Sequence, residues 1–129
     1  MRMTEGTIRG FPLIVINGDL DHSSKQTVRE AVDDLMYGAF PPQSLLFDLT
    51  ECPYVDSGGL GVLLSALRQL PANGWLGLIG VSPGIKRVLT YSGLLDIERV
   101  RFFPSRGEVE ATLNPAQKPS RTKNAESSL

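Results

Sequence analysis

The sequence predicts a single α/β domain, built around a central mixed sheet of four to five strands with about four helices packed against it. Three observations lead to this fold class. Short continuous apolar runs are typical of strands that are covered on both faces. These runs alternate with segments whose apolar residues recur at helical spacing. Ahead of both, two extended segments meet at Gly10 and predict an opening β-hairpin.

The predicted strands follow one another along the chain. Residues 3–9 are expected to pair across Gly10 with the strand that begins at Leu13. Continuous apolar runs predict that this strand, at residues 13–16, is buried, and they predict two further buried strands at residues 45–47 and 75–79. Residues 100–103 predict an edge strand.

Helices are expected between and after these strands. A first apolar stripe ends before Pro41 and comprises Val28, Ala31, Val32, Leu35 and Met36. A second stripe ends at Pro71 and comprises Leu60, Leu63, Leu64, Leu67 and Leu70. A third, shorter stripe comprises Ile85, Val88 and Leu89, and the sequence Ser92-Gly93-Leu94 after it suits a helix C-cap. Residues 108–113 predict a last helix.

Length and composition suit one intracellular globular domain. The chain has 129 residues and a formal net charge of −1, so no overall positive field points to nucleic acid or to an anionic membrane. No apolar run approaches membrane-spanning length, and the first residues lack the apolar core of a signal peptide. A cytoplasmic location is expected. The single cysteine, Cys52, excludes an internal disulfide and is expected to be a small apolar residue near the core.

The domain is expected to occupy residues 1–113. Residues 114–129 lack an apolar period and are rich in Pro, Ser, Lys and Asn, which predicts a disordered C-terminal tail. This tail carries Lys118, Arg121 and Lys123 against Glu126. A solvated end is the simpler interpretation of these charges, and a functional basic tail is the alternative.

The junction between the second predicted buried strand and the helix after it carries the most informative motif. Asp56 and Ser57 stand directly before the Leu60 stripe, which places the Ser57 hydroxyl at or near a helix N-terminus. Free backbone N–H groups and the helix dipole favour an anion there. A purely structural interpretation is also open: Asp56 or Ser57 caps the helix, and Gly58 and Gly59 make the turn.

Three segments together resemble the STAS-domain family of anti-sigma factor antagonists. Residues 47–63, which include Asp56-Ser57-Gly58-Gly59-Leu60-Gly61, are similar to the family's Asp-Ser-(Ser/Thr)-Gly-Leu-Gly signature. Residues 17–21 resemble the family's Gly-Glu-Leu-Asp, and residues 81–94 resemble its third crossover, where Ser-Pro opens a helix that ends in Ser-Gly-Leu. The likeness spans about residues 5 to 113.

The resemblance implies a phosphorylation-controlled switch, with Ser57 at the phosphorylated position. In this family an anti-sigma factor, which is a serine kinase of the GHKL type, phosphorylates that serine. The unmodified antagonist captures the kinase, the phosphorylated form releases it, and a metal-dependent serine phosphatase resets the switch. A monomer or a weak dimer is expected, with no cofactor, no metal and no nucleic acid.

The resemblance and the position of the loops also imply a partner-binding surface. Its expected residues are Asp21, His22, Ser23, Ser24, Asp56, Ser57, Gly58, Gly59 and Gly61. For Asp21 and Ser24, capping of the first helix is the open alternative. Gly58 departs from the family pattern, which has a small hydroxyl residue there, and a looser loop is expected as a result.

Catalytic interpretations are weaker. Residues 80–84 fit the Gly-x-Ser-x-Gly elbow of hydrolases, but the single histidine, His22, precedes Ser82 instead of following it, and Pro83 lacks the N–H of an oxyanion hole. Ser82-Pro83 is therefore expected to start a helix. A triad of Ser57, His22 and an Asp has no support from spacing. One histidine and one cysteine supply no metal set, and the glycines at 58–61 lack the Lys and the spacing of a phosphate-binding loop. The chain is therefore not expected to be an enzyme.

Two other functions stay open. The same domain type occurs as a non-phosphorylated partner subunit, bound to a transporter ATPase or within a stress-signalling complex. The site there often carries Thr or lacks the serine, so Ser57 favours the switch. A small-molecule or nucleotide binder is the other alternative, and it requires a pocket beside Ser57.

Overall fold

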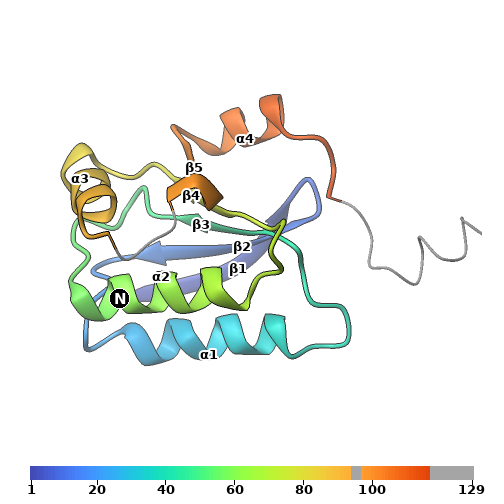
Figure 1. The fold of residues 1–129 in the computed structure, drawn as a ribbon. Helices are drawn as coiled ribbons and strands as arrows, with labels where there is room; N and C mark the ends of the chain where they lie inside the picture. Colours follow the sequence, from blue (N-terminus) through green and yellow to red (C-terminus); the bar gives the residue numbers. More distant parts are fainter. Residues whose placement is uncertain (94–96, 117–129) are drawn as a thin grey trace, which may run out of the picture.

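The computed structural model describes residues 1–93 and 97–116. Figure 1 shows a five-stranded sheet between helices. The strands are β1 (Arg2–Ile8), β2 (Phe11–Asn17), β3 (Leu45–Asp48), β4 (Leu76–Ile79) and β5 (Val100–Phe103). The α-helices are α1 (Lys25–Met36), α2 (Ser57–Gln69), α3 (Pro83–Tyr91) and α4 (Arg106–Thr112), and a 3₁₀ turn, η1 (Ile97–Arg99), precedes β5.

The sheet has the strand order β1-β2-β3-β4-β5. β1 and β2 pair antiparallel, and every other neighbouring pair is parallel. The hairpin turn consists of Arg9 and Gly10, both with positive φ, of 54° and 81°. Two consecutive residues of positive φ match the twist of paired strands, so the turn holds the β1–β2 register. The mixed sheet and the opening hairpin predicted from the sequence are confirmed.

Helices cover both faces of the sheet. Figure 1 shows α1 and α2 side by side on one face and α4 on the other. The larger core lies under α1, α2 and α3 and includes Ile14, Phe47, Leu63, Leu78 and Leu89. The smaller core lies under α4, with Ile8, Leu13, Leu46, Ile79, Phe103 and Val109. Alternate residues of the strands point to opposite cores, which explains why these strands read as continuous apolar runs.

Arg99 closes the C-terminal end of α2. Its guanidinium donates hydrogen bonds to the carbonyl oxygens of Pro71 (2.8 Å), Gly74 (3.2 Å), Leu67 (3.4 Å) and Leu70 (3.5 Å). The last carbonyls of a helix have no partner within the helix and carry partial negative charge. Arg99 satisfies this end, so α2 is held from η1, a segment about 30 residues further along the chain.

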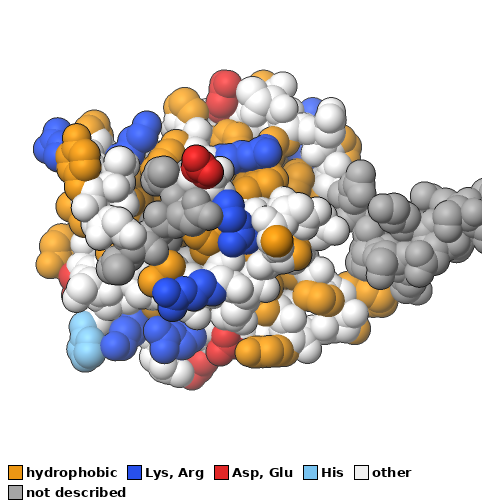
Figure 2. All heavy atoms as spheres, viewed as in Figure 1, with side chains coloured by type: hydrophobic (Ala, Val, Ile, Leu, Met, Phe, Trp, Pro, Cys, Tyr) orange, Lys and Arg blue, Asp and Glu red, His pale blue; other side chains and the backbone are white. Residues whose placement is uncertain are grey.

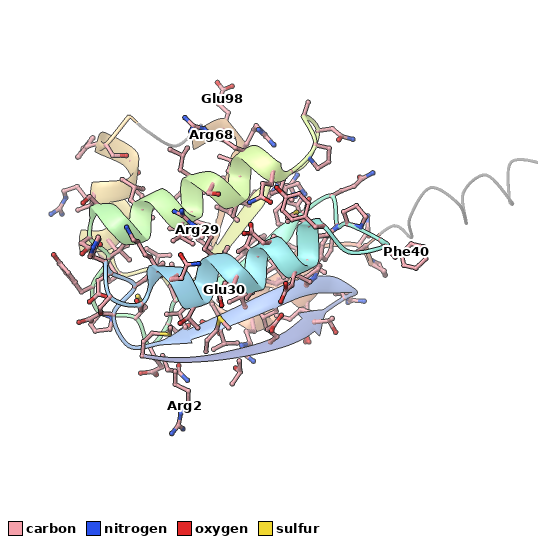
Figure 3. All side chains as sticks on the ribbon, turned by 90° about the horizontal axis from the view of Figure 1, so that it is seen from below. Arg2, Arg29, Glu30, Phe40, Arg68 and Glu98 are labelled. Carbon is pink, nitrogen blue, oxygen red and sulfur yellow. The ribbon has the colours of Figure 1, made fainter. Side chains whose placement is uncertain are left out.

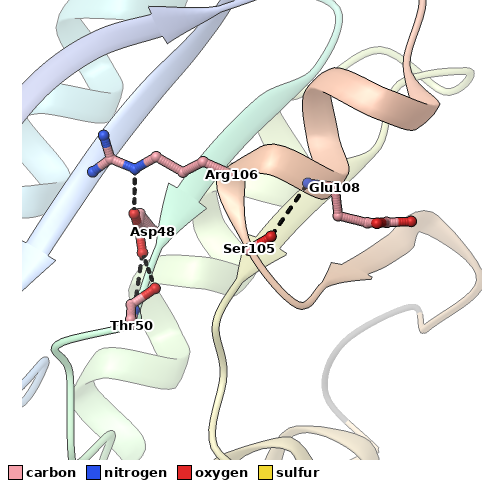
Figure 4. Close-up of polar contacts among 5 residues, drawn as sticks. All are labelled: Asp48, Thr50, Ser105, Arg106 and Glu108. Carbon is pink, nitrogen blue, oxygen red and sulfur yellow. Dashed lines mark hydrogen bonds and ion pairs between the residues drawn. The ribbon is translucent and has the colours of Figure 1, made fainter.

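A buried carboxylate anchors α4 to the sheet (Figure 4). Asp48 Oδ2 accepts a hydrogen bond from Arg106 Nε (2.6 Å), and Oδ1 accepts from the hydroxyl (2.6 Å) and the backbone N–H (2.9 Å) of Thr50. Burial by itself would raise the pKa of Asp48, but the hydrogen bonds from Thr50 and the charge of Arg106 outweigh it and lower this pKa. Asp48 is therefore ionised and paired, as a buried charge requires.

The positions of the predicted strands and helices are confirmed, with one error of detail. Val88 was expected on the buried stripe of α3, but its side chain is 52% exposed, because only Ile85 and Leu89 face the core. Cys52 lies in the core, as predicted, and burial raises the pKa of its thiol. Among the described residues, no helix is both long and apolar enough to cross a membrane.

The predicted boundary at residue 113 falls just after α4. The chain stays in contact with the domain for three more residues, since the Ala116 N–H donates to the Arg9 carbonyl (2.8 Å). The rest of the predicted tail, residues 117–129, lies outside the described residues, and so does Leu94 of the predicted C-cap.

Candidate phosphorylation and partner-binding site

The candidate site is formed where the loop before α1 meets the loop before α2. The two loops pair through their backbones: the Gly18 N–H donates to Glu51 O, the Leu20 N–H to Tyr54 O, and the Asp56 N–H back to Leu20 O. Leu20 and Val55 form a parallel bridge. This backbone pairing extends the parallel pairing of β2 and β3 beyond the ends of the two strands. It gives the start of α2 a fixed position relative to the start of α1.

The side chain of Asp56 links the start of α2 to the loop before α1. It is the N-cap of α2: Oδ1 accepts from the Gly59 N–H (3.0 Å), while Oδ2 accepts from the His22 N–H (3.1 Å) of the other loop. The hydrogen bond from Gly59, followed by the one from His22, keeps the pKa of Asp56 below its ordinary value. The structural interpretation of Asp56 is thus correct: its charge is used within the domain.

Ser57 is the first residue of α2, and its side chain is exposed. Within the described part of the chain, no hydrogen bond or ion pair involves its hydroxyl, because Asp56 has taken over the capping role. The hydroxyl is therefore open to solvent at the positive end of a 13-residue helix. A negative charge placed at this position would be favoured by the N-terminus of the helix.

Glycines allow the close approach of the two loops. A Cβ at Gly59 would lie 2.0 Å from the Leu20 carbonyl oxygen, so no other residue fits without moving the backbone. At Gly58 a Cβ would lie 3.0 Å from His22 Cα, which is tight. Gly58, where a looser loop was expected, belongs to the first turn of α2 and lies close to His22.

The structure divides the expected partner-binding residues into three groups. His22, Ser23 and Ser57 are exposed, and Figure 2 shows the single histidine beside Lys and Arg side chains at one corner of the molecule. Asp21, Asp56, Gly58 and Gly61 are half-buried. Ser24 and Gly59 are buried, so they belong to the packing of the two loops and are not part of the exposed surface of the described chain.

Asp21 and Ser24 form a closed turn before α1. Asp21 Oδ1 accepts from the backbone N–H groups of Ser23 (3.0 Å) and Ser24 (3.1 Å) and from the Ser23 hydroxyl (2.8 Å), which lowers the pKa of Asp21. The Ser24 hydroxyl donates to the Asp19 carbonyl (2.8 Å). Ser24 occupies the N-cap position of α1 without a side-chain capping bond. The capping alternative is therefore not met as expected: Asp21 closes the turn before α1, and neither Asp21 nor Ser24 caps the helix itself with its side chain.

Ser82, the serine of the Gly-x-Ser-x-Gly sequence, starts α3 as expected. Its hydroxyl accepts a hydrogen bond from the Ile85 N–H (3.3 Å), and Pro83 is the first residue of the helix. The sequence interpretation missed three exposed apolar side chains on α3 and on the loop before α2: Tyr54 (53%), Val88 (52%) and Tyr91 (80%). Apolar periodicity gives no signal for them, because it does not separate a core residue from an exposed one beside it.

The sequence pattern that defines the STAS domain family matches residues 4–109 of this chain. The chain belongs to the STAS family. STAS membership confirms the resemblance noted in the sequence, and it agrees with a binding protein instead of an enzyme.

Two curated relatives of the STAS chain are anti-sigma factor antagonists. The anti-sigma-B factor antagonist of Listeria monocytogenes is 34% identical over 89 residues, which cover 68% of this chain and 76% of the relative. The anti-sigma F factor antagonist of Paenibacillus polymyxa is 29% identical over 90 residues, which cover 69% of this chain and 76% of the relative.

The fold agrees with solved STAS structures. The phosphorylated form of the Bacillus cell fate determinant SpoIIAA superimposes with a TM-score of 0.66 at 20% identity, covering 87% of this chain and 100% of that one. At this identity the likeness concerns the fold: one domain with a five-stranded mixed sheet and helices on both faces.

Proposed function

We propose that this STAS protein is an anti-sigma factor antagonist whose binding to an anti-sigma serine kinase of the GHKL type is controlled by phosphorylation of Ser57. The unmodified form binds the kinase, the phosphorylated form releases it, and a serine phosphatase restores binding. The proposal includes a cytoplasmic location, where the kinase finds its ATP, and an antagonist that is a monomer or a weak dimer.

One observation carries the proposal: the Ser57 hydroxyl is exposed and has no hydrogen-bond partner in the described chain, although it lies at a helix N-terminus. The names of the relatives support the role, and a phosphorylated form of one fold relative is known. The exposed His22 and Ser23 on the neighbouring loop extend the surface around Ser57.

The proposed switch is electrostatic. A phosphate adds about −1.5 to −2 charge at neutral pH. Within the free domain the helix N-terminus tolerates this charge. Ser57 follows Asp56 directly in the chain, so the phosphate adds its charge beside an ionised carboxylate. Once a partner excludes water from these charges, the repulsion strengthens and the complex dissociates.

The decisive experiment incubates the protein with ATP and a GHKL anti-sigma kinase encoded near it, and locates added phosphate by mass spectrometry. We expect one phosphate on Ser57 and none on the Ser57→Ala variant. Ser82 is the internal control, since it is also exposed at a helix start but uses its hydroxyl as a cap. Modification of Ser82 alone, or no modification with an active kinase, would contradict the proposal.

A further inference from the structure

A cavity lies at the opposite end of the sheet from Ser57, and it plays no part in the proposed switch. Its volume is about 800 Å³, which is within the range of small-molecule sites. Three connections meet there: the β1–β2 turn, the loop from α1 to β3, and the residues after α4 (Figure 1). Figure 3 shows Phe40 projecting from the second of these.

Aromatic rings and prolines form the apolar wall of the cavity. Phe11 at the start of β2 packs against Trp75 just before β4, with ring centroids 5.2 Å apart. Both residues are only half-buried, although Trp75 also packs on Phe103 of the smaller core. Pro12 and Pro42 also line this wall. An apolar ligand placed here would bury aromatic surface that is now in water.

The polar part of the cavity attracts anions. The Arg101 guanidinium lies 4.5 Å from the centre of the Trp75 ring. None of the described residues that line the cavity is Asp or Glu, and no carboxylate of the described chain pairs with Arg101. The other polar side chains are neutral: Gln43, Ser44, Asn73, Thr112 and Asn114. Among the described residues, therefore, nothing neutralises the charge of Arg101 at the edge of this apolar recess.

We propose that this cavity binds a small organic anion with an apolar ring body. The ring packs against Phe11 and Trp75, and the carboxylate or phosphate of the ligand pairs with Arg101. A guanidinium that already stacks on an aromatic ring is held in place, so little side-chain freedom is lost when it pairs with an oxyanion. The inference does not depend on the proposed switch.

Trp75 is the only tryptophan, so the single indole N–H signal in a ¹H–¹⁵N spectrum reports directly on this cavity. The full chain is titrated with 2-naphthoate, 1-naphthyl phosphate and neutral 2-naphthalenemethanol. We expect at least one anion to shift the indole signal and to bind about tenfold more tightly than the neutral probe, as one charge-assisted pair allows. The anion that binds more tightly identifies the headgroup class.

Variants separate the charge from the ring. Arg101→Gln should remove the preference for the anion and leave weak binding of the neutral probe, whereas Phe11→Leu should weaken all probes. Arg87→Gln is the matched control, because it removes an exposed arginine from α3, outside the cavity. The proposal is overturned if no anion moves the indole signal at millimolar concentration, or if Arg101→Gln keeps the full preference.

Discussion

At the scale of single residues, the structure assigns helix capping to Asp56 and leaves the Ser57 hydroxyl exposed, whereas the sequence allowed either residue to be the cap. Asp56 and Ser57 were both candidates for the helix cap, and the cap needs only one of them. Because Asp56 supplies it and also holds the His22 N–H, the Ser57 hydroxyl is left without an internal task. Among the described residues Ser57 has no partner for its hydroxyl, and it is also the residue that we propose as the phosphorylation site.

Substitutions at Ser57 test the charge switch directly. Ser57→Ala should bind the kinase like the unmodified protein, whereas Ser57→Asp should bind at least about tenfold more weakly, because it adds a like charge beside Asp56. Isothermal titration calorimetry with the purified kinase measures both. Ser105→Asp is the control: it places the same charge at the start of α4, on the other face of the sheet, and should not change the affinity. Equal binding by Ser57→Asp and wild type would exclude the switch.

Two glycines of α2 should respond in opposite directions to the same substitution. Gly59→Ala should destabilise the fold by about 1–3 kcal/mol or more, since its methyl group would overlap the Leu20 carbonyl. Gly61→Ala has no atom within 4 Å of the added methyl group and should stabilise the helix by about 0.5–1 kcal/mol. Denaturant unfolding measures both changes. A neutral Gly59→Ala would show that the loops are not in close contact.

At the scale of helices and strands, the two ends of α2 are held by side chains from different parts of the chain. Asp56 fixes the N-terminal end, and Arg99, from η1, fixes the C-terminal end. On the other face, the Asp48–Arg106 pair fixes α4. The Asp56–His22, Arg99–Pro71 and Asp48–Arg106 contacts each join segments that are distant in sequence, so each should contribute to the cooperativity of unfolding.

Removal of the Arg99 side-chain charge should loosen the end of α2. Arg99→Met leaves the carbonyl oxygens of Leu70 and Gly74 without the Arg99 donor, while those of Leu67 and Pro71 keep a backbone N–H donor. The change should lower the free energy of unfolding by about 1–3 kcal/mol. Arg68→Met is the control, since Arg68 points away from α2 into solvent (Figure 3) and should change stability by less than about 0.5 kcal/mol. Amide exchange of the last turn of α2 should accelerate in the first variant only. Equal stabilities would contradict the capping role.

Asp48 should make the fold sensitive to acid. Its pKa lies below the ordinary value of 3.8 in the folded state, so the unfolded chain binds this proton more readily. The contribution of the ionised carboxylate is complete above that value and is lost as the pH falls through the folded pKa. Asp48→Asn removes this dependence. Between about pH 5 and pH 2 the wild type should therefore lose more stability than the variant. Denaturant unfolding at a series of pH values measures this, and equal losses of the free energy of unfolding in the two proteins would contradict the prediction.

At the scale of the whole molecule, the fold could be predicted because apolar runs and apolar stripes alternate without interruption from Leu13 to Val109. The position of Ser57 could be predicted for a related reason: Asp-Ser-Gly directly before an apolar stripe marks a helix start. The stabilising pairs of Arg99 and Asp48 could not, since they depend on how distant segments meet in space. The exposed Val88 and the cavity at Trp75 escaped prediction for the same reason.

The double fixation of α2 also has a consequence for how a partner would read this surface. A helix held at both ends has little backbone freedom left to lose when another protein docks on it. Affinity for such a rigid platform depends on its shape and charge, and hardly on an ordering step. A single phosphate added to such a surface would then change the affinity for a partner without a change in the backbone conformation.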